Sequence, residues 1–333
     1  AGTLENLSAN NLDNQRAIVK AGAIDPLIEL VTDERDFFKK DDETQVLLRL
    51  AANNPDDQKA IMGKLVTILK NGKPYQKEMA AQALRNLAED NPDNQNAIVE
   101  AGAIDPLVKL LDGTNTQKEH AAEALKALAE NNPEIKVVIA KADAIDPLVK
   151  LLKNGNPFQK ESAARALGDL AENNPGNQNA IVKAGAIDPL IKFLTDETDE
   201  TDEGDFNKND NVAEALGNLA ANNPDHQKAI MGTLVTILKN GTDTKKENAT
   251  WALWYLAYDN QNAIANAGGI ELIVRLLTDG TAKQIENATG ALIDLARNNP
   301  DNQKSIMEKL VTILRDGTGT QKENAAKVLR NFK

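Results

Sequence analysis

Four aromatic residues lie close together in a chain that has few others: Trp251, Trp254, Tyr255 and Tyr258. They include both tryptophans and two of the three tyrosines of a 333-residue sequence in which aromatic residues make up 3%. Their spacing places all four within about 100° of one another around an α-helix. Rings on one exposed helix face offer apolar contact and cation–π interaction with Lys or Arg side chains. The stretch is therefore the strongest candidate for a ligand surface.

Side chains for catalysis or metal binding are scarce by comparison. The sequence has no cysteine and only two histidines, His120 and His226, which we expect to be surface or loop residues. Isolated histidines indicate neither a catalytic triad nor a two-histidine metal site, and no glycine-rich phosphate loop occurs. The segment 196–205 is rich in carboxylates but lacks the ligand order of an EF-hand, which favours a flexible acidic insertion. We expect no catalytic residue, no metal and no cofactor, and hence no enzyme.

The composition indicates an acidic protein with enough apolar residues for a core. Hydrophobic residues make up 41% of the chain, and 38 Lys and Arg residues against 50 Asp and Glu residues give a formal net charge of -12. This charge opposes binding to nucleic acid or anionic membranes and favours a basic partner. No apolar run approaches the roughly 18 to 20 residues needed to cross a bilayer, and the segment 1–11 is polar. We expect a cytoplasmic or nuclear protein.

One motif recurs along the whole chain and sets its organisation. Its clearest copy runs from Pro92 to Asn132, and a glutamine near its start marks successive copies about 40 residues apart. The marker positions are Gln15, Gln58, Gln95, Lys136, Gln178, Gln227, Gln261 and Gln303. We predict a single solenoid domain over 1–333, with a partial repeat at 1–11 and repeats at 12–54, 55–91, 92–132, 133–174, 175–223, 224–260, 261–299 and 300–333.

A complete repeat is expected to form three helices. In the third repeat, one apolar stretch ends at Gly102, a second begins near Pro106, and a third runs from Gln117 to Glu130. Repeats two, six and eight have two residues where this repeat has seven, and they lose the Gly-Ala-Ile-Asp-Pro hinge, so their first two helices are expected to merge. Repeats one and five instead carry longer acidic connections, at 32–44 and 195–211.

The motif resembles the armadillo repeat through its Gly-Ala-Ile-x-Pro-Leu-Val-x-Leu-Leu element at Gly22, Gly102 and Gly185 and its Ala-Leu-x-x-Leu-Ala third helix. The resemblance implies an all-α fold, a right-handed superhelical α-solenoid whose shortened repeats are HEAT-like two-helix units. It also implies a concave groove lined by third helices, where a Trp and an Asn one turn later grip an extended peptide. The Trp position is held by Trp251 alone. The Asn position is held by Asn6, Arg49, Asn86, Ala127, Asp169, Asn218, Tyr255, Asp294 and Asn331.

The aromatic stripe is predicted to be exposed rather than buried. Its helix already has apolar residues at the positions that the repeat pattern assigns to the core, and the aromatic positions are mostly polar in repeats three and four. The residues predicted for the core of this helix are Ala249, Ala252, Leu253 and Leu256.

Two functions fit these patterns. The first is a non-enzymatic protein–protein interaction scaffold that binds an extended, basic peptide along the concave third-helix surface. The second is a structural or self-assembling array that associates end to end, or an engineered repeat protein without a natural ligand. For the scaffold, we predict ring contacts from Trp251, Trp254, Tyr255 and Tyr258, peptide-backbone contacts from Asn86 and Asn218, and attraction of basic side chains by Asp169, Glu172 and Asp294.

Overall fold

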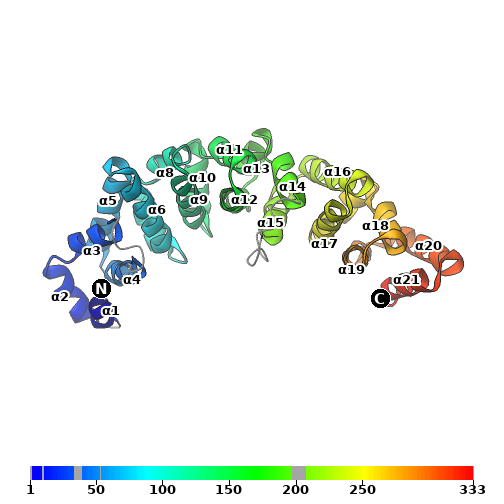
Figure 1. Ribbon diagram of the computed structural model, residues 1–333, viewed down its shortest axis with the longest axis horizontal. Coiled ribbons are helices and arrows are strands. Elements are labelled where there is room, and N and C mark those ends of the chain that lie inside the picture. The colour runs from blue at the N-terminus through cyan, green and yellow to red at the C-terminus, as the bar shows by residue number, and fades with distance from the viewer. Residues whose placement is uncertain (1, 10, 34–39, 53, 197–207, 333) are drawn as a thin grey trace. The chain divides into compact units, whose positions relative to one another are not determined.

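Helices make up all regular secondary structure in the computed structural model, which describes residues 2–9, 11–33, 40–52, 54–196 and 208–332 (Figure 1). These ranges contain 21 α-helices and no strand, which confirms the predicted all-α repeat fold. The chain forms two compact units: residues 1–170 with 174–181, and residues 171–173 with 182–333. The single continuous solenoid stays a prediction from the sequence.

Three helices form each complete repeat, as predicted. In the third repeat they are α7 (Pro92–Glu100), α8 (Ile104–Leu110) and α9 (Asn115–Ala129). Gly102 has a φ of 81°, a conformation that glycine adopts without strain, and it turns the chain between α7 and α8. The equivalent helices of the other three-helix repeats are α2 (Leu12–Lys20), α3 (Ile24–Val31) and α4 (Lys40–Ala52); α10 (Pro133–Lys141), α11 (Ile145–Asn154) and α12 (Pro157–Ala171); and α13 (Pro175–Lys183), α14 (Ile187–Thr195) and α15 (Lys208–Ala220).

Repeats two, six and eight begin with one continuous helix of 17 residues, which confirms the predicted merger. Without the glycine–proline hinge, nothing in these sequences stops the first helix. The merged helices are α5 (Pro55–Asn71), α16 (Pro224–Asn240) and α20 (Pro300–Asp316), and they pack against α6 (Pro74–Ala88), α17 (Asp243–Asn266) and α21 (Gly319–Leu329), respectively. The partial repeat supplies α1 (Gly2–Ser8), which packs against α4.

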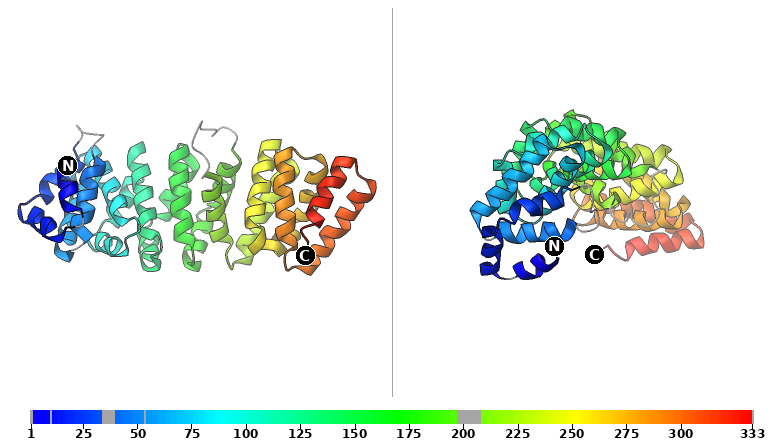
Figure 2. Two further views of the ribbon diagram at one scale, coloured as in Figure 1. Left: turned by 90° about the horizontal axis from the view of Figure 1, so that it is seen from below. Right: turned by 60° about the vertical axis from the view of Figure 1, so that its left-hand side comes forward.

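A junction between repeats six and seven differs from the others. Most repeats are separated by an Asn-Pro pair after a residue with positive φ, such as Asn298 at 54°. The sequence Tyr258-Asp259-Asn260 has no such proline, so α17 continues to Asn266 with a kink at Asn260, where φ is -127° and ψ is 23°. The seventh repeat then completes itself with α18 (Gly269–Asp279) and α19 (Ala282–Ala296). Third helices of neighbouring repeats lie side by side, as α6 and α9 do in the first unit and α17 and α19 in the second (Figure 2).

Buried amide side chains join helices both within a repeat and between neighbouring repeats. The Nδ2 of Asn94 donates to the backbone oxygen of Leu87 at 2.7 Å, and the Nε2 of Gln95 donates to the backbone oxygen of Ala127 at 2.9 Å. The marker glutamine therefore satisfies carbonyl groups at the end of a third helix, which otherwise lack partners inside the helix. This role explains why an amide recurs at the marker position of most repeats.

A threonine cap starts α9 and several other third helices. The hydroxyl of Thr114 accepts the N–H of Gln117 at 3.2 Å, and the side chain of Gln117 accepts the N–H of Thr114 at 3.1 Å. We expect Thr114→Ala to lower the free energy of unfolding by about 1 kcal/mol, because the cap satisfies a backbone donor. Thr116→Ala, at an exposed position one residue inside the same turn, is the control. Equal effects of the two changes on urea unfolding would contradict the capping role.

Most of the two acidic connections lies outside the described residues, which exclude 34–39 and 197–207. In the part of the chain that is described, no helix is long and apolar enough to span a membrane.

Candidate functional site

The aromatic stripe lies on α17, the third helix of repeat six, and faces away from the core. Trp254, Tyr255 and Tyr258 are 36%, 50% and 57% exposed, and Trp251 is half-buried. The rings of Trp251 and Tyr255 pack together with their centroids 5.6 Å apart and their planes tilted by 33°. The four residues predicted for the core side of this helix are all buried: Ala249, Ala252, Leu253 and Leu256.

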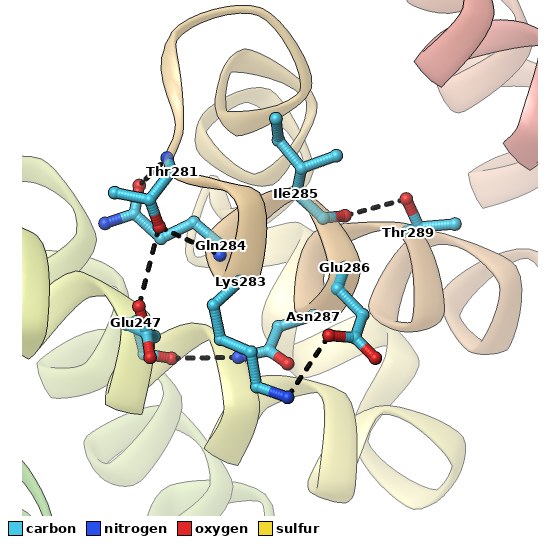
Figure 3. Close-up of polar contacts among 8 residues, drawn as sticks. All are labelled: Glu247, Thr281, Lys283, Gln284, Ile285, Glu286, Asn287 and Thr289. Atoms are coloured by element: carbon cyan, nitrogen blue, oxygen red, sulfur yellow. Dashed lines mark hydrogen bonds and ion pairs between the residues drawn. The ribbon is translucent and has the colours of Figure 1, made fainter.

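Hydrogen bonds near its start hold α19 against α17 (Figure 3). Thr281 caps α19, because its hydroxyl accepts the N–H of Gln284 at 3.2 Å, and it also donates to the carboxylate of Glu247 at 3.5 Å. The Nδ2 of Asn287 donates to the backbone oxygen of Glu247 at 3.3 Å. These contacts set the register of α19 against α17 one turn before Gly290, where the stripe meets α19.

Trp254 packs directly on α19 at a position that only glycine leaves open. A Cβ atom built on Gly290 would lie 2.4 Å from Cε2 of the Trp254 indole, well inside contact distance. The indole Nε1 donates to Oδ2 of Asp294 at 3.1 Å. Trp254 is therefore a fixed wall of the surface, with its single polar group already satisfied.

A basic side chain of the protein itself covers Tyr258. The guanidinium carbon of Arg297 lies 5.9 Å from the centroid of the Tyr258 ring, and Nη2 of Arg297 lies 2.8 Å from Oδ1 of Asp294. Asp294, which we predicted to attract a basic ligand, thus already binds both Trp254 and Arg297. Of the four aromatic residues, Trp251 and Tyr255 are the pair without these contacts to α19.

Carboxylates of the neighbouring third helix lie near this pair. Asp210 and Glu214 are exposed on α15, one turn apart. Partial burial raises the pKa of the Tyr255 phenol, and the negative charges of Glu214 and Asp210 raise it further. We call Trp251, Tyr255, Asp210 and Glu214 the ring–carboxylate patch. Sequence reasoning missed the two carboxylates, although their spacing of four residues, continued to Asn218, indicates one helix face.

The other predicted residues are divided between the two units. Asn218 is half-buried on α15 and Glu172 half-buried in the segment 171–173, both in the second unit. Asn86 on α6 and Asp169 on α12 are half-buried in the first unit. The structure therefore gathers Trp251, Trp254, Tyr255, Tyr258 and Asp294 on α17 and α19, while a groove shared with Asn86 and Asp169 stays a prediction.

In repeat three, which belongs to the first unit, the positions equivalent to Trp251 and Trp254 carry the charged residues Glu123 and Lys126. Nη1 of Arg85 lies 2.8 Å from Oε2 of Glu123, and Lys126 pairs with Glu130 at 2.6 Å. A cavity of about 10 Å³ lies between Arg85, Glu123, Lys126 and Arg165, and it has room for one water at most. This surface is a network of paired charges and has no pocket for a ligand side chain at this place.

Both histidines are more buried than we predicted, so their assignment to the surface is wrong. His226 is 8% exposed, and its Nδ1 lies 3.0 Å from the backbone oxygen of Leu219. It takes the place that Asn94 has in repeat three, directly before the marker glutamine, and makes the same contact to the carbonyl seven residues earlier. The side chain of His120 is 14% exposed, with Nδ1 3.9 Å from Glu123.

Comparison with known proteins bears on the fold. The family profile of HEAT repeats matches residues 104–203. A crystal structure of an engineered protein is 31% identical, covers 70% of this chain and 96% of its own, and superposes with a TM-score of 0.54. The chain has an armadillo/HEAT-like repeat fold.

Two further solved structures similar to this repeat protein are also engineered or designed. One engineered protein is 26% identical over 82% of this chain and 98% of its own, with a TM-score of 0.50. A designed armadillo repeat protein in complex with the peptide (KR)4 is 22% identical over 82% of this chain and 99% of its own, with a TM-score of 0.44. No curated protein sequence matches the chain.

Proposed function

We propose that this repeat protein is an interaction scaffold that binds an extended, basic peptide segment on its third-helix surface, with the main contact at the ring–carboxylate patch. The packing of half-buried Trp251 on exposed Tyr255, close to the charges of Asp210 and Glu214, is the observation that carries the proposal. A Lys or Arg side chain over these rings gains about 0.5 to 2 kcal/mol from cation–π interaction. The carboxylates add charge complementarity, which speeds encounter and rejects acidic ligands.

The residues around the patch suit a peptide backbone. Trp254 provides a rigid apolar wall, since Gly290 and Asp294 hold its indole in place. Asn218 lies on the same helix as Asp210 and Glu214 and carries both donor and acceptor groups for an extended peptide. The predicted contributions of Asn86, Asp169 and Glu172 would extend the contact to further ligand residues. The formal net charge of -12 favours the same basic class of partner.

The test follows the fluorescence of the two tryptophans while an extended Lys/Arg-rich peptide is added. We expect a saturable change that is weakened by salt and absent with a Gln-substituted peptide of the same length. Trp251→Ala should weaken binding by about tenfold, because aromatic anchors carry much of the binding energy in such interfaces. Trp254 remains as the reporter in this variant.

A matched control tests whether binding depends on the ring–carboxylate patch or on any exposed aromatic side chain. Phe158 is 61% exposed on α12 of the first unit and belongs to neither α15 nor α17, so Phe158→Ala should leave binding unchanged. If the double variant Trp251→Ala with Tyr255→Ala binds as tightly as the parent protein, the proposed site is wrong. If no peptide of either kind binds, the alternative of a purely architectural array is favoured.

A further inference from the structure

The last repeat exposes apolar side chains that the same helix sequence buries elsewhere in the chain. α5, α16 and α20 share the sequence Ile-Met-x-x-Leu-Val-Thr-Ile-Leu. Met62 and Val66 of α5 are 0% and 2% exposed, and the equivalent residues of α16 are also buried. In α20, the equivalent Met307 and Val311 are 43% and 54% exposed. The sequences match, so the difference comes from what covers each helix.

The following repeat covers these residues inside the chain. In the first unit, α5 packs against α7 and α8 of the third repeat. In the second unit, α16 packs against α18, and Cγ2 of Val235 is 3.2 Å from the Cβ position of Gly269 at the start of that helix. The natural cover for Met307 and Val311 is therefore the pair of short helices that opens a repeat.

The first repeat opens with such a pair of short helices, α2 and α3, and this pair also has an exposed apolar side chain. Residues 17–27 match residues 97–107 of the third repeat at every position except one, where Lys20 replaces Glu100. Leu30 on α3 is 42% exposed, whereas the equivalent Leu110, which follows repeat two, is 6% exposed. The two ends thus expose both halves of the junction that repeats two and three form inside the chain.

We propose that copies of this chain associate head to tail, with α20 of one copy stacking on α2 and α3 of the next. The contact would reproduce the packing of α5 on α7 and α8, burying Met307 and Val311 against the surface around Leu30. Such an interface is heterologous, because the two copies contribute different faces, and it can therefore continue from copy to copy. The association uses residues apart from the ring–carboxylate patch.

Head-to-tail stacking requires the helix of the partial repeat, α1, to leave its place. α1 occupies the place of a preceding third helix against α4, so α21 of the incoming copy must displace it. α1 has only seven residues, too few for a stable helix on its own, and Glu5 pairs with Arg49 of α4 at 3.2 Å. In the repeat alignment, Arg330, directly after α21, corresponds to Glu5. The incoming helix therefore places Arg330 near Arg49, a like-charge contact that limits the affinity.

Sedimentation velocity or light scattering over about a hundredfold range of protein concentration tests the interface. We expect the average mass to rise above that of the monomer, and the separate changes Val311→Glu and Leu30→Glu each to restore the monomer. These side chains are exposed in the single chain, so both variants should keep the parent circular dichroism spectrum. A mixture of the two variants should form a one-to-one dimer and nothing larger, since one working face of each kind remains.

Arg330→Glu tests the register of the stack. It replaces the like-charge contact with a pair to Arg49, so we expect at least about fivefold tighter association. Lys304→Glu is the control for net charge, because its equivalent Lys59 stays exposed even where α5 is covered. A parent protein and an Arg330→Glu variant that are both strictly monomeric would overturn the proposal. So would a Leu30→Glu variant that still dimerises, which would indicate a tail-to-tail contact.

Discussion

Gly290→Ala is expected to lower the free energy of unfolding of the second unit by about 1–3 kcal/mol, the usual cost of forcing extra atoms into a packed contact. Alanine normally stabilises the interior of a helix relative to glycine by up to about 1 kcal/mol. Here the added methyl group would lie 2.4 Å from the Trp254 indole, so either the ring or α19 must move. Urea unfolding followed by circular dichroism measures the change.

Gly232→Ala on α16 is the matched control in the same unit. A Cβ atom at Gly232 meets nothing within 4 Å, so this change should stabilise the protein by up to about 1 kcal/mol. Helix propensity acts in the same direction at both positions, so opposite signs of the two stability changes would assign the loss at 290 to the steric contact. Destabilisation of similar size at both positions would show that the indole contact is not the cause.

A double variant locates the effect on Trp254. Combining Gly290→Ala with Trp254→Ala removes the ring that the methyl group would strike, so the cost of the alanine at 290 should disappear or reverse. Gly290→Ala alone should also shift the Trp254 emission to longer wavelength, because the displaced indole loses its hydrogen bond to Asp294 and gains contact with water. Unchanged emission together with additive energies would contradict this packing.

The repeat architecture was predictable because it depends on local sequence. Gly102, the Asn-Pro breaks and the missing hinges in repeats two, six and eight each act within a few residues, and the helix ends follow them. The exposure of the aromatic stripe was also predictable, since alignment of the repeats separates core from surface positions. The contacts that the rings of the stripe make inside the protein could not be predicted in this way.

The contacts between repeats required the three-dimensional structure. Trp254 belongs to repeat six, whereas Gly290 and Asp294 belong to repeat seven. Neither the missing Cβ at 290 nor the indole hydrogen bond leaves a pattern within one repeat. The contact of Arg297 with the ring of Tyr258 also joins two repeats, so the sequence of a single repeat does not reveal it either. The error at His226 has a local cause: we treated a histidine as a departure from the pattern, whereas it makes the hydrogen bond of the asparagine that it replaces.

Two glutamates on α9 are expected to affect stability in opposite directions. Burial opposes ionisation of Glu123, but the polar contact with His120, followed by the positive charges of Arg85 and Arg165, outweighs it and lowers the pKa of Glu123. Burial raises the pKa of Glu119, and the negative charge of Glu123 raises it further. Both groups lie on α9 in the first unit, so each can be changed without altering a residue of the aromatic stripe.

The sign of each effect follows from proton binding. A carboxyl whose folded pKa is lowered stabilises the protein above its ordinary pKa, and this contribution is lost as the pH falls through the folded value. At pH 7, Glu123→Gln should therefore cost about 1.5–3 kcal/mol, the range for a hydrogen bond to a charged group. A carboxyl whose folded pKa is raised destabilises the ionised protein, so Glu119→Gln should stabilise it by less than about 1 kcal/mol.

Measuring both variants at pH 7 and again near pH 3 separates charge from shape. Glutamine has nearly the size of a protonated glutamate, so both differences from the parent protein should shrink once the carboxyls are protonated at low pH. Arg85 is the partner that makes the loss at Glu123 large, because removing the carboxylate leaves its guanidinium facing Arg165 without a counter-charge. Equal destabilisation by both variants at pH 7 would mean that packing, rather than charge, sets the role of these side chains.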